Sequence, residues 1–300
     1  PAAYTACHEA GVPVVQSLHN PRLLCPAATF TRNDRSCQDC LGKTLPWPGI
    51  LHACYRDSRP QTAAVAAMLT VHRWRRTWTQ DVDRYIVATE FYWQKFIEGG
   101  LPADRLVVKP HFVTPDPLPR VDEPGDYALY MGRLEPVKGV RVLLAAWERA
   151  GTIPLKVRGE GPLLAEVQAL AARTATVEVI GRLSPDALTQ LIKGARFLVW
   201  PSLGYYETFG LVAIEAFACG VPVIASRTGV MAEIVTDGVT GLHFTAGDPA
   251  DLAAKVRWAW EHPAEMAEMG RAARREFEQK YTAERNYAQL MHIYESLLKQ

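Results

Sequence analysis

Two glutamates, Glu207 and Glu215, are separated by seven residues in the second half of the chain. Glu215 lies within Leu211–Cys219, where every other residue is apolar, and a helix of this composition is buried on all sides. A buried carboxylate is costly unless donors reach it, and the hydroxyls of a vicinal diol are such donors. We therefore expect Glu215 to bind a ribose-like diol and Glu207 to face the other end of the same ligand. An internal Arg or Lys partner is the alternative.

A basic cluster precedes this pair in the sequence. Arg133 and Lys138 lie within Gly132–Gly139, which follows the apolar run 127–131 and leads into a helical pattern. A cation at the start of a helix opposes the helix dipole unless an anion joins it. Two cations with free helix amides suit a diphosphate, so we expect one to bind there, with Gly132 providing the turn. Two solvated surface charges are the alternative.

The elements that must position these residues alternate between strand and helix. Strands are predicted at 127–131, 155–157, 177–180, 197–200, 222–225 and 242–244, with helices at 140–149, 163–173, 185–193, 211–219 and 249–260. This order is typical of a parallel sheet covered on both faces, which binds ligands at the carboxyl ends of its strands. Gly159-Glu-Gly161 lacks the third glycine of a dinucleotide fingerprint.

The first part of the chain repeats the theme more briefly. We expect helices at 3–10, 63–78 and 90–98, and strands at 12–18, 84–89 and 106–109. The proline-rich stretch 114–125 reads as a linker. The predicted organisation is a domain over 1–113 with a Cys-rich insert at 20–60, a second domain over 126–262, and helices over 263–300 that pack back toward the first.

These motifs together resemble one known family. Gly132–Gly139, the turn at 159–162, the Glu207–Glu215 pair and Gly220-Val-Pro-Val223 followed by Gly229 are similar to the donor half of a retaining glycosyltransferase of family 4. The resemblance implies the α/β GT-B fold, with two Rossmann-like domains whose parallel sheets face across a cleft. The chain enters at a helix, so we expect the first strands of the first domain to be missing and transfer to be weak.

The resemblance also implies residue roles. Arg133 and Lys138 would hold the donor diphosphate, Glu215 the nucleotide ribose, and Glu207 the hydroxyls of the transferred sugar. His19, after the strand at 12–18, would face that sugar from the acceptor side.

Other donor contacts follow from the same resemblance. Backbone amides of Phe209, Gly210 and Leu211 would meet phosphate or sugar, and Arg182 and Leu183 would lie by the base. The family needs no metal for the diphosphate. We reject Asp81-Val-Asp83 as a metal motif, because it precedes a strand instead of following one.

Four cysteines gather in a segment with little periodicity. Cys25, Cys37, Cys40 and Cys54 have the spacing C-x₁₁-C-x₂-C-x₁₃-C. The close pair is typical of a tetrahedral zinc site, although the outer spacings match no standard module. We predict a structural zinc; reduced thiols are the main alternative, with an iron–sulfur cluster or disulfides less favoured.

Composition limits the class of protein. The 300 residues are 48% hydrophobic and 22% charged, with a net charge of +1, so nucleic-acid binding through bulk charge is not expected. No apolar run would span a bilayer, which favours a cytoplasmic protein. A helix over Ala63–Trp78 with Arg73, Arg75, Arg76 and Trp74 at its end allows peripheral contact with the inner membrane face, although a packed helix is favoured.

The sequence therefore predicts transfer of a hexose-type sugar from a nucleoside-diphosphate sugar to a glycan, lipid-linked or small-molecule acceptor, with retention of anomeric configuration. A catalytically silent nucleotide-sugar-binding subunit is one alternative. A zinc-dependent nucleic-acid module built on Cys25–Cys54 is the other, and the near-zero charge disfavours it.

Overall fold

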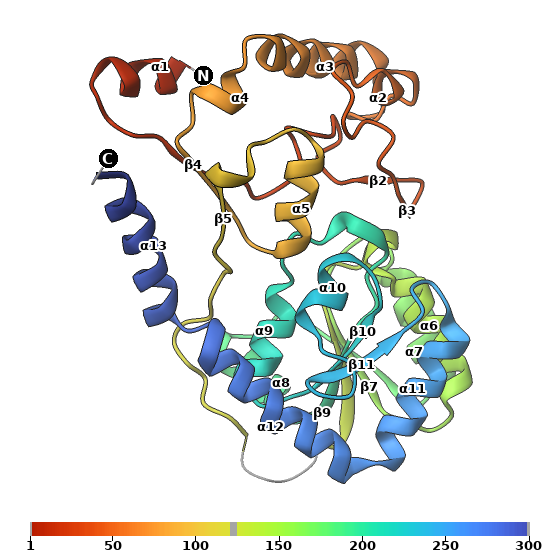
Figure 1. Ribbon diagram of the computed structural model, residues 1–300. Helices are drawn as coiled ribbons and strands as arrows, with labels where there is room; N and C mark the ends of the chain where they lie inside the picture. Colours follow the sequence, from red (N-terminus) through yellow and green to blue (C-terminus); the bar gives the residue numbers. More distant parts are fainter. Residues whose placement is uncertain (1, 121–124, 299–300) are drawn as a thin grey trace. The chain divides into compact units, whose positions relative to one another are not determined.

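The computed structural model describes residues 2–120 and 125–298. Two compact units are present (Figure 1). Unit 1 comprises Pro1–His111 with Glu284–Gln300, and unit 2 comprises Phe112–Ala283. The second unit begins before the predicted linker and includes the first of the two C-terminal helices.

Unit 2 is built on a six-stranded parallel sheet. Its strands are β6 (Tyr127–Met131), β7 (Leu155–Arg158), β8 (Val177–Ile180), β9 (Ala195–Trp200), β10 (Val223–Ser226) and β11 (Gly241–Phe244). Their order across the sheet is β11-β10-β9-β6-β7-β8. The chain thus starts in the centre, runs outward to β8, returns to β9 and runs outward to β11. Crevices at such a reversal are where open α/β sheets bind ligands.

Helices cover both faces of this sheet. They are α6 (Val140–Ala150), α7 (Leu164–Arg173), α8 (Pro185–Lys193), α9 (Leu211–Ala218), α10 (Gly229–Ile234), α11 (Pro249–Glu261) and α12 (Pro263–Lys280). All five residues of β6 are buried, as expected for a central strand with two covered faces. Ala128 and Tyr130 share one core cluster with residues of α6, α7 and α11, whereas α8 and α9 pack against β9 from the other side (Figure 1).

Local sequence explains several helix starts in unit 2. The Ser184 hydroxyl accepts a hydrogen bond from the Ala187 amide, and Pro185 occupies the first position of α8. The Asp248 carboxylate accepts from two amides in the first turn of α11, which Pro249 opens. Capping side chains satisfy amides that have no partner within the helix, and proline is well placed at the first position because it has none to satisfy.

Unit 1 has a smaller parallel sheet of three strands in the order β1-β4-β5. These are β1 (Val15–Ser17), β4 (Arg84–Val87) and β5 (Leu106–Val108). Its helices are α1 (Ala2–Glu9), α3 (Arg59–Trp74), α4 (Thr77–Gln80), α5 (Glu90–Glu98) and α13 (Ala283–Leu298). Asp83, in the rejected Asp-x-Asp motif, accepts a hydrogen bond from the Val14 amide, at 2.7 Å. That carboxylate therefore orders the start of β1.

The Cys-rich segment (residues 20–60) contains little regular structure. It holds the two-residue strands β2 (Thr31–Arg32) and β3 (Arg35–Ser36), which form a hairpin, and the short helix α2 (Trp47–Leu51). Seven of the nine non-glycine residues with positive φ in the described part of the chain lie here: Ala28, Phe30, Asn33, Asp34, Ala53, Arg56 and Asp57. Such backbone is costly and persists only where surrounding contacts enforce it.

One helical prediction needs correction. The helix expected over 63–78 begins earlier and ends at Trp74, because Arg76 has a left-handed backbone with φ of 55° that separates α3 from α4. The stretch 263–300 contains helices as predicted, α12 and α13, divided after Tyr281. Helix α10 was not predicted, since its six residues are too few to show a helical period.

Candidate functional site

Glu207 and Lys138 meet in unit 2 although 69 residues separate them in sequence. The Lys138 ammonium donates to Oε1 of Glu207 at 2.6 Å, and both side chains are largely buried. Trp200 Nε1 and the Ser202 hydroxyl donate to the same oxygen, at 3.2 and 2.6 Å. No bond to Oε2 is recorded within the described residues. One oxygen of this carboxylate is therefore held by the protein, and the other can accept from a ligand.

Tyr206 joins the two cations of the predicted diphosphate site. The Arg133 guanidinium donates to the Tyr206 hydroxyl and to Glu135, at 2.8 Å for the latter. The Lys138 ammonium lies 5.2 Å from the centre of the Tyr206 ring, and the Arg133 guanidinium lies 5.6 Å from it. Both contacts are in the range of a cation–π interaction. The sequence interpretation missed Tyr206, because nothing in the order of residues relates an aromatic ring at 206 to a cation at 133.

Glu215 lies on α9, where Ala213, Ile214, Ala216 and Phe217 are buried. No hydrogen bond or ion pair of its carboxylate is recorded within the described part of the chain. Burial raises the pKa of the Glu215 carboxyl above its ordinary value, and the charge of Arg158 partly opposes this rise. Glu207 therefore has an internal Lys partner, the alternative considered from the sequence. Glu215 instead keeps carboxylate oxygens that could accept hydrogen bonds from a ligand diol.

The start of α9 requires glycine. Gly210 has φ of 96°, and a Cβ on it would lie 2.0 Å from the Trp200 ring. Leu211, at the first position of the helix, is 47% exposed. Phe209 is buried and packs edge-on against Tyr281, with ring centres 5.9 Å apart. The turn therefore leaves the first amides of α9 without side-chain caps, as a bound phosphate would need.

A pocket of about 820 Å³ opens at the carboxyl ends of β6, β7 and β8. Four of the predicted donor residues line it: Gly132, Arg133, Arg182 and Leu183. Arg158 and Glu160 line it as well and were not predicted, although a cation that ends a parallel strand is a signal that could have identified Arg158. Glu160 accepts from Arg182 at 2.7 Å, and this pair is exposed.

The predicted donor residues thus fall into two groups within unit 2. Gly132, Arg133, Arg182 and Leu183 line the pocket, whereas Lys138, Glu207, Phe209, Gly210, Leu211 and Glu215 do not. Two contacts relate the groups. Arg133, from the first group, donates to the Tyr206 hydroxyl, and Lys138, from the second, lies over the Tyr206 ring. Arg158, which lines the pocket, acts through its charge on Glu215 of the second group. All ten residues belong to the same unit, and the arrangement offers cations and free amides at the strand ends.

His19 belongs to unit 1 and is exposed. Its ring stacks on that of His111, with centres 5.7 Å apart. Burial lowers the pKa of His111, and the neighbouring His19 and Lys109 lower it further. His111 therefore favours its neutral form, which allows two imidazoles to stack without charge repulsion. The role predicted for His19 toward the transferred sugar stays a prediction.

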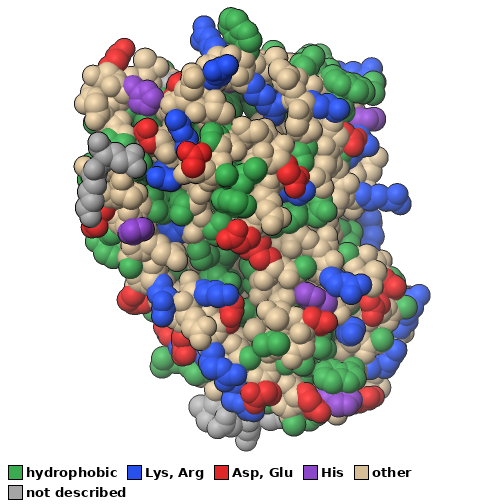
Figure 2. Space-filling view, viewed as in Figure 1, with side chains coloured by type: hydrophobic (Ala, Val, Ile, Leu, Met, Phe, Trp, Pro, Cys, Tyr) green, Lys and Arg blue, Asp and Glu red, His purple; other side chains and the backbone are tan. Residues whose placement is uncertain are grey.

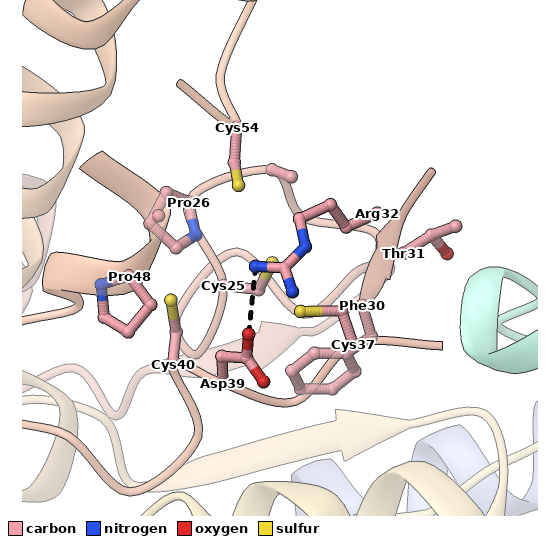
Figure 3. A pocket seen from close by; sticks show the side chains of 12 residues that line it. Cys25, Pro26, Phe30, Thr31, Arg32, Cys37, Asp39, Cys40, Pro48 and Cys54 are labelled. Atoms are coloured by element: carbon pink, nitrogen blue, oxygen red, sulfur yellow. Dashed lines mark ion pairs between the residues drawn. The ribbon is translucent and has the colours of Figure 1, made fainter. Parts of the chain in front are cut away.

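The four predicted zinc ligands line one small cavity in unit 1. Cys25, Cys37, Cys40 and Cys54 reach it from separate turns (Figure 3). Burial raises the pKa of the Cys40 thiol to about 11, and it also raises the pKa values of Cys37 and Cys54. Across residues 2–120 and 125–298, no three or more His, Cys, Asp or Glu side chains already form a metal-binding group. The zinc therefore stays a prediction.

The Trp and Arg residues near the end of α3 have different surroundings. Arg73 donates to the main-chain carbonyls of Leu23, Lys43 and Thr44, and Trp78 is buried against His72, with ring centres 4.7 Å apart. Trp74 is 80% exposed. In the described chain, no helix combines the length and apolarity needed to cross a bilayer. On the face shown in Figure 2, acidic and basic side chains are interspersed.

Comparison with curated proteins finds relatives that match about half of the chain. Over 161 residues it is 34% identical to D-rhamnosyltransferase WbpZ of Pseudomonas aeruginosa, which covers 52% of this chain and 42% of that protein. Over 155 residues it is 39% identical to a glycogen synthase of Mycobacterium tuberculosis, covering 49% of this chain and 36% of the relative. The chain thus spans less than half the length of these curated relatives.

Comparison with solved structures covers nearly the whole chain. The crystal structure of Anabaena Alr3699/HepE in complex with UDP matches 98% of this chain and 75% of its own, with a TM-score of 0.73 and 19% identity. A likeness at this identity concerns the fold. Together with the parallel sheets of both units, it confirms the predicted α/β GT-B fold class.

The family model for glycosyl transferases group 1 matches residues 119–276, which is more than half of the chain and contains the whole donor-side motif set. Its span includes the Lys138–Glu207 pair, Glu215 and the pocket at the strand ends. The chain therefore belongs to the family of glycosyl transferases group 1.

Proposed function

We propose that this chain is a retaining glycosyltransferase of family 4 that uses a nucleoside-diphosphate sugar as donor. The observation that carries the proposal is the Glu215 carboxylate, which has no partner among the described residues, in a unit whose strand ends form a pocket bordered by Arg133 and Arg158. A carboxylate kept partly buried without donors is unfavourable for the free protein, so a ligand that supplies hydroxyls is its natural complement. Family membership and the UDP bound in the matching HepE structure support the same donor class.

The charges of the site suit departure of a diphosphate. Arg133 and Lys138 would stabilise the developing negative charge on the leaving group, together with the uncapped amides at the start of α9. Retention would follow a displacement on the same face of the sugar, with the leaving phosphate taking the acceptor's proton. Oε2 of Glu207, which accepts no hydrogen bond from the described residues, would accept from hydroxyls of the hexose. Glu215 would accept from the ribose, and Arg182 and Leu183 would lie beside the base.

Donor binding is the first test. Thermal shift with a panel of nucleoside diphosphates and nucleotide sugars identifies the base and sugar, because a ligand stabilises the state that binds it. Calorimetry then compares the native chain with Glu215→Ala and with Glu148→Ala, an exposed glutamate on α6 of the same unit. We expect at least tenfold weaker binding for the first variant and unchanged binding for the second. Absence of binding by every nucleotide in the panel would refute the proposal.

Turnover separates an enzyme from a silent binding subunit. The donor identified above is incubated with the chain, and release of the nucleoside diphosphate and the anomeric configuration of the product are followed by NMR. Retained configuration supports the proposal, and inverted configuration contradicts it. Binding without hydrolysis or transfer supports the alternative of a catalytically silent nucleotide-sugar-binding subunit. His19→Ala should lower turnover and leave nucleotide affinity unchanged.

The acceptor is proposed more broadly, as a glycan, a lipid-linked saccharide or a small molecule. We place the protein in the cytoplasm, with exposed Trp74, Arg75 and Arg76 available for peripheral contact with an anionic membrane. Sedimentation with phosphatidylglycerol vesicles, compared with neutral vesicles and with Trp74→Ser, tests that contact. The resemblance implies that no metal is needed for the diphosphate, so turnover should not require added Mg²⁺ or Mn²⁺, and nucleic acid should not bind.

A further inference from the structure

Four of the five cysteines of unit 1 converge from four different turns. Cys25 follows a turn that starts at Pro21, Cys37 follows β3, Cys40 begins the next turn, and Cys54 follows α2. All four line one cavity, with their sulfur atoms directed toward a shared space (Figure 3). They are spread over 30 residues of sequence, so it is the fold of the segment that brings them together.

The size and lining of this cavity suit a single ion. Its volume is about 10 Å³, room for one atom the size of a water molecule. Pro26, Phe30 and Pro48 supply apolar walls. We propose that Cys25, Cys37, Cys40 and Cys54 bind one Zn²⁺ as tetrahedral thiolates. Four thiolates without an open position are typical of a structural zinc site, and the Cys37–Cys40 spacing is the close pair such sites use.

Other candidate ligands near the cavity are accounted for. The Asp39 carboxylate is paired with the Arg32 guanidinium at 2.9 Å, and His52 is exposed and does not line the cavity. Arg32 lies among the sulfur atoms in Figure 3, and its charge would partly offset the two net negative charges of a Zn²⁺ with four thiolates. The side chains must shift to bring the sulfurs to bonding distance, because no metal-binding group is already formed among the described residues.

The segment around the cavity has little regular structure to hold its backbone in place. Its strands have two residues each, and seven of its residues have unfavourable positive φ. Strands this short give an irregular stretch of this length little order from backbone hydrogen bonding. An ion bound at four positions would order the hairpin β2–β3, the turn at 37–40 and the end of α2 together. This inference concerns unit 1 and does not depend on the proposed donor chemistry of unit 2.

Metal content is the first test. The full chain is purified without added chelator or metal and analysed by mass spectrometry of its elements. We expect about one zinc per chain, as one tetrathiolate site requires. Replacement by Co²⁺ should give the strong visible absorption of tetrahedral cobalt–thiolate coordination. Metal-free protein with unchanged melting, iron with inorganic sulfide, or disulfides in protein kept under nitrogen would each overturn the proposal.

The chain contains its own matched controls, because two further cysteines lie elsewhere. Cys7 is in α1, and Cys219 is buried in unit 2. Single Cys→Ala changes at positions 25, 37, 40 and 54 should each remove most of the zinc, whereas Cys7→Ala and Cys219→Ala should keep it. Asp39→Asn should keep it too. Full zinc in all four variants would refute the site. If these variants fail to fold, the cobalt spectrum of the native chain decides.

Discussion

The donor-side unit (unit 2) and the Cys-rich segment hold their backbones in place through different kinds of contact. In the described part of unit 2, six parallel strands and seven helices hold the backbone through regular hydrogen bonds, and the candidate site lies on the loops that leave the strand ends. In residues 20–60, turns are held by individual contacts, such as those of Arg73 with three carbonyls. Unit 2 therefore derives its geometry from the regular elements of its fold, whereas the Cys-rich segment depends on a few specific side chains.

If unit 2 derives its geometry from its regular elements, a small substitution should lower stability most where it pushes two of these elements apart. Gly139 precedes α6 with φ of 72°, and a Cβ there would lie 1.9 Å from the main-chain oxygen of Pro201. Gly139→Ala should therefore destabilise unit 2 by at least ~3 kcal/mol, since backbone must move. Urea unfolding followed by hydrogen exchange in residues 125–280 measures this loss.

Gly151, at the other end of α6, is the matched control. It also has positive φ, of 82°, but a Cβ there meets no atom within 4 Å. Gly151→Ala should cost ~1–3 kcal/mol, because φ of 82° with ψ of −127° is strained for alanine but no neighbouring atom has to move. Equal losses of stability for Gly139→Ala and Gly151→Ala would show that the loss comes from the backbone conformation of each glycine. The close approach of Gly139 to Pro201 would then contribute little.

The buried ion pair gives the next largest effect. Lys138→Ala leaves Oε1 of Glu207 with its bonds from Trp200 and Ser202 but without a cation, and we expect a loss of ~2–3 kcal/mol in stability. Glu207→Gln alone should also destabilise. The double variant Lys138→Ala with Glu207→Gln should cost less than the two single changes added, by ~1–3 kcal/mol. Additive losses would mean that the pair is not coupled.

The Cys-rich segment should respond to a single arginine. Arg73→Ala removes the donor to the carbonyls of Leu23 and Thr44, at 2.8 and 3.2 Å, and to that of Lys43. We expect a loss of ~2 kcal/mol, with faster hydrogen exchange confined to unit 1. Arg75→Ala, two residues away and exposed, should change stability by less than ~0.5 kcal/mol. Faster hydrogen exchange in unit 2 as well would contradict the view that Arg73 stabilises the Cys-rich segment specifically.

The same contrast explains what the sequence could predict. The bounds of α8 and β6 were predicted to the residue, because a Ser-Pro cap and an unbroken apolar run mark them. The uncompensated burial of Glu215 was inferred from its apolar neighbours. The partner of Glu207 could not be assigned, since Lys138 is distant in sequence and no period relates the two. The break at Arg76 was equally hidden, because left-handed backbone at an arginine leaves no mark on hydrophobic periodicity.

Glu215 gives the smallest change in stability, and its sign is opposite to the others. Burial raises the pKa of this carboxyl in the folded unit, so the folded chain binds its proton at a higher pH than the unfolded chain does. Stability therefore falls as pH rises from the ordinary value through the raised one, and the full penalty is present above the raised pKa. Glu215→Gln should raise the melting temperature by a few degrees at neutral pH and by less at pH 4. A lower melting temperature at pH 7 would contradict this account.

Nucleotide affinity should depend on pH in the other direction. Ribose hydroxyls that donate to Glu215 favour its ionised form, so the affinity of the native chain for the nucleoside diphosphate should fall as pH is lowered through the raised pKa. Glu215→Gln should bind about tenfold more weakly at pH 7, a loss of about 1.4 kcal/mol, and should lose this particular pH dependence. Calorimetry at several pH values measures both. A variant that gains stability while it loses affinity would show that the carboxylate is kept for a ligand, at a cost to the regular unit that holds it.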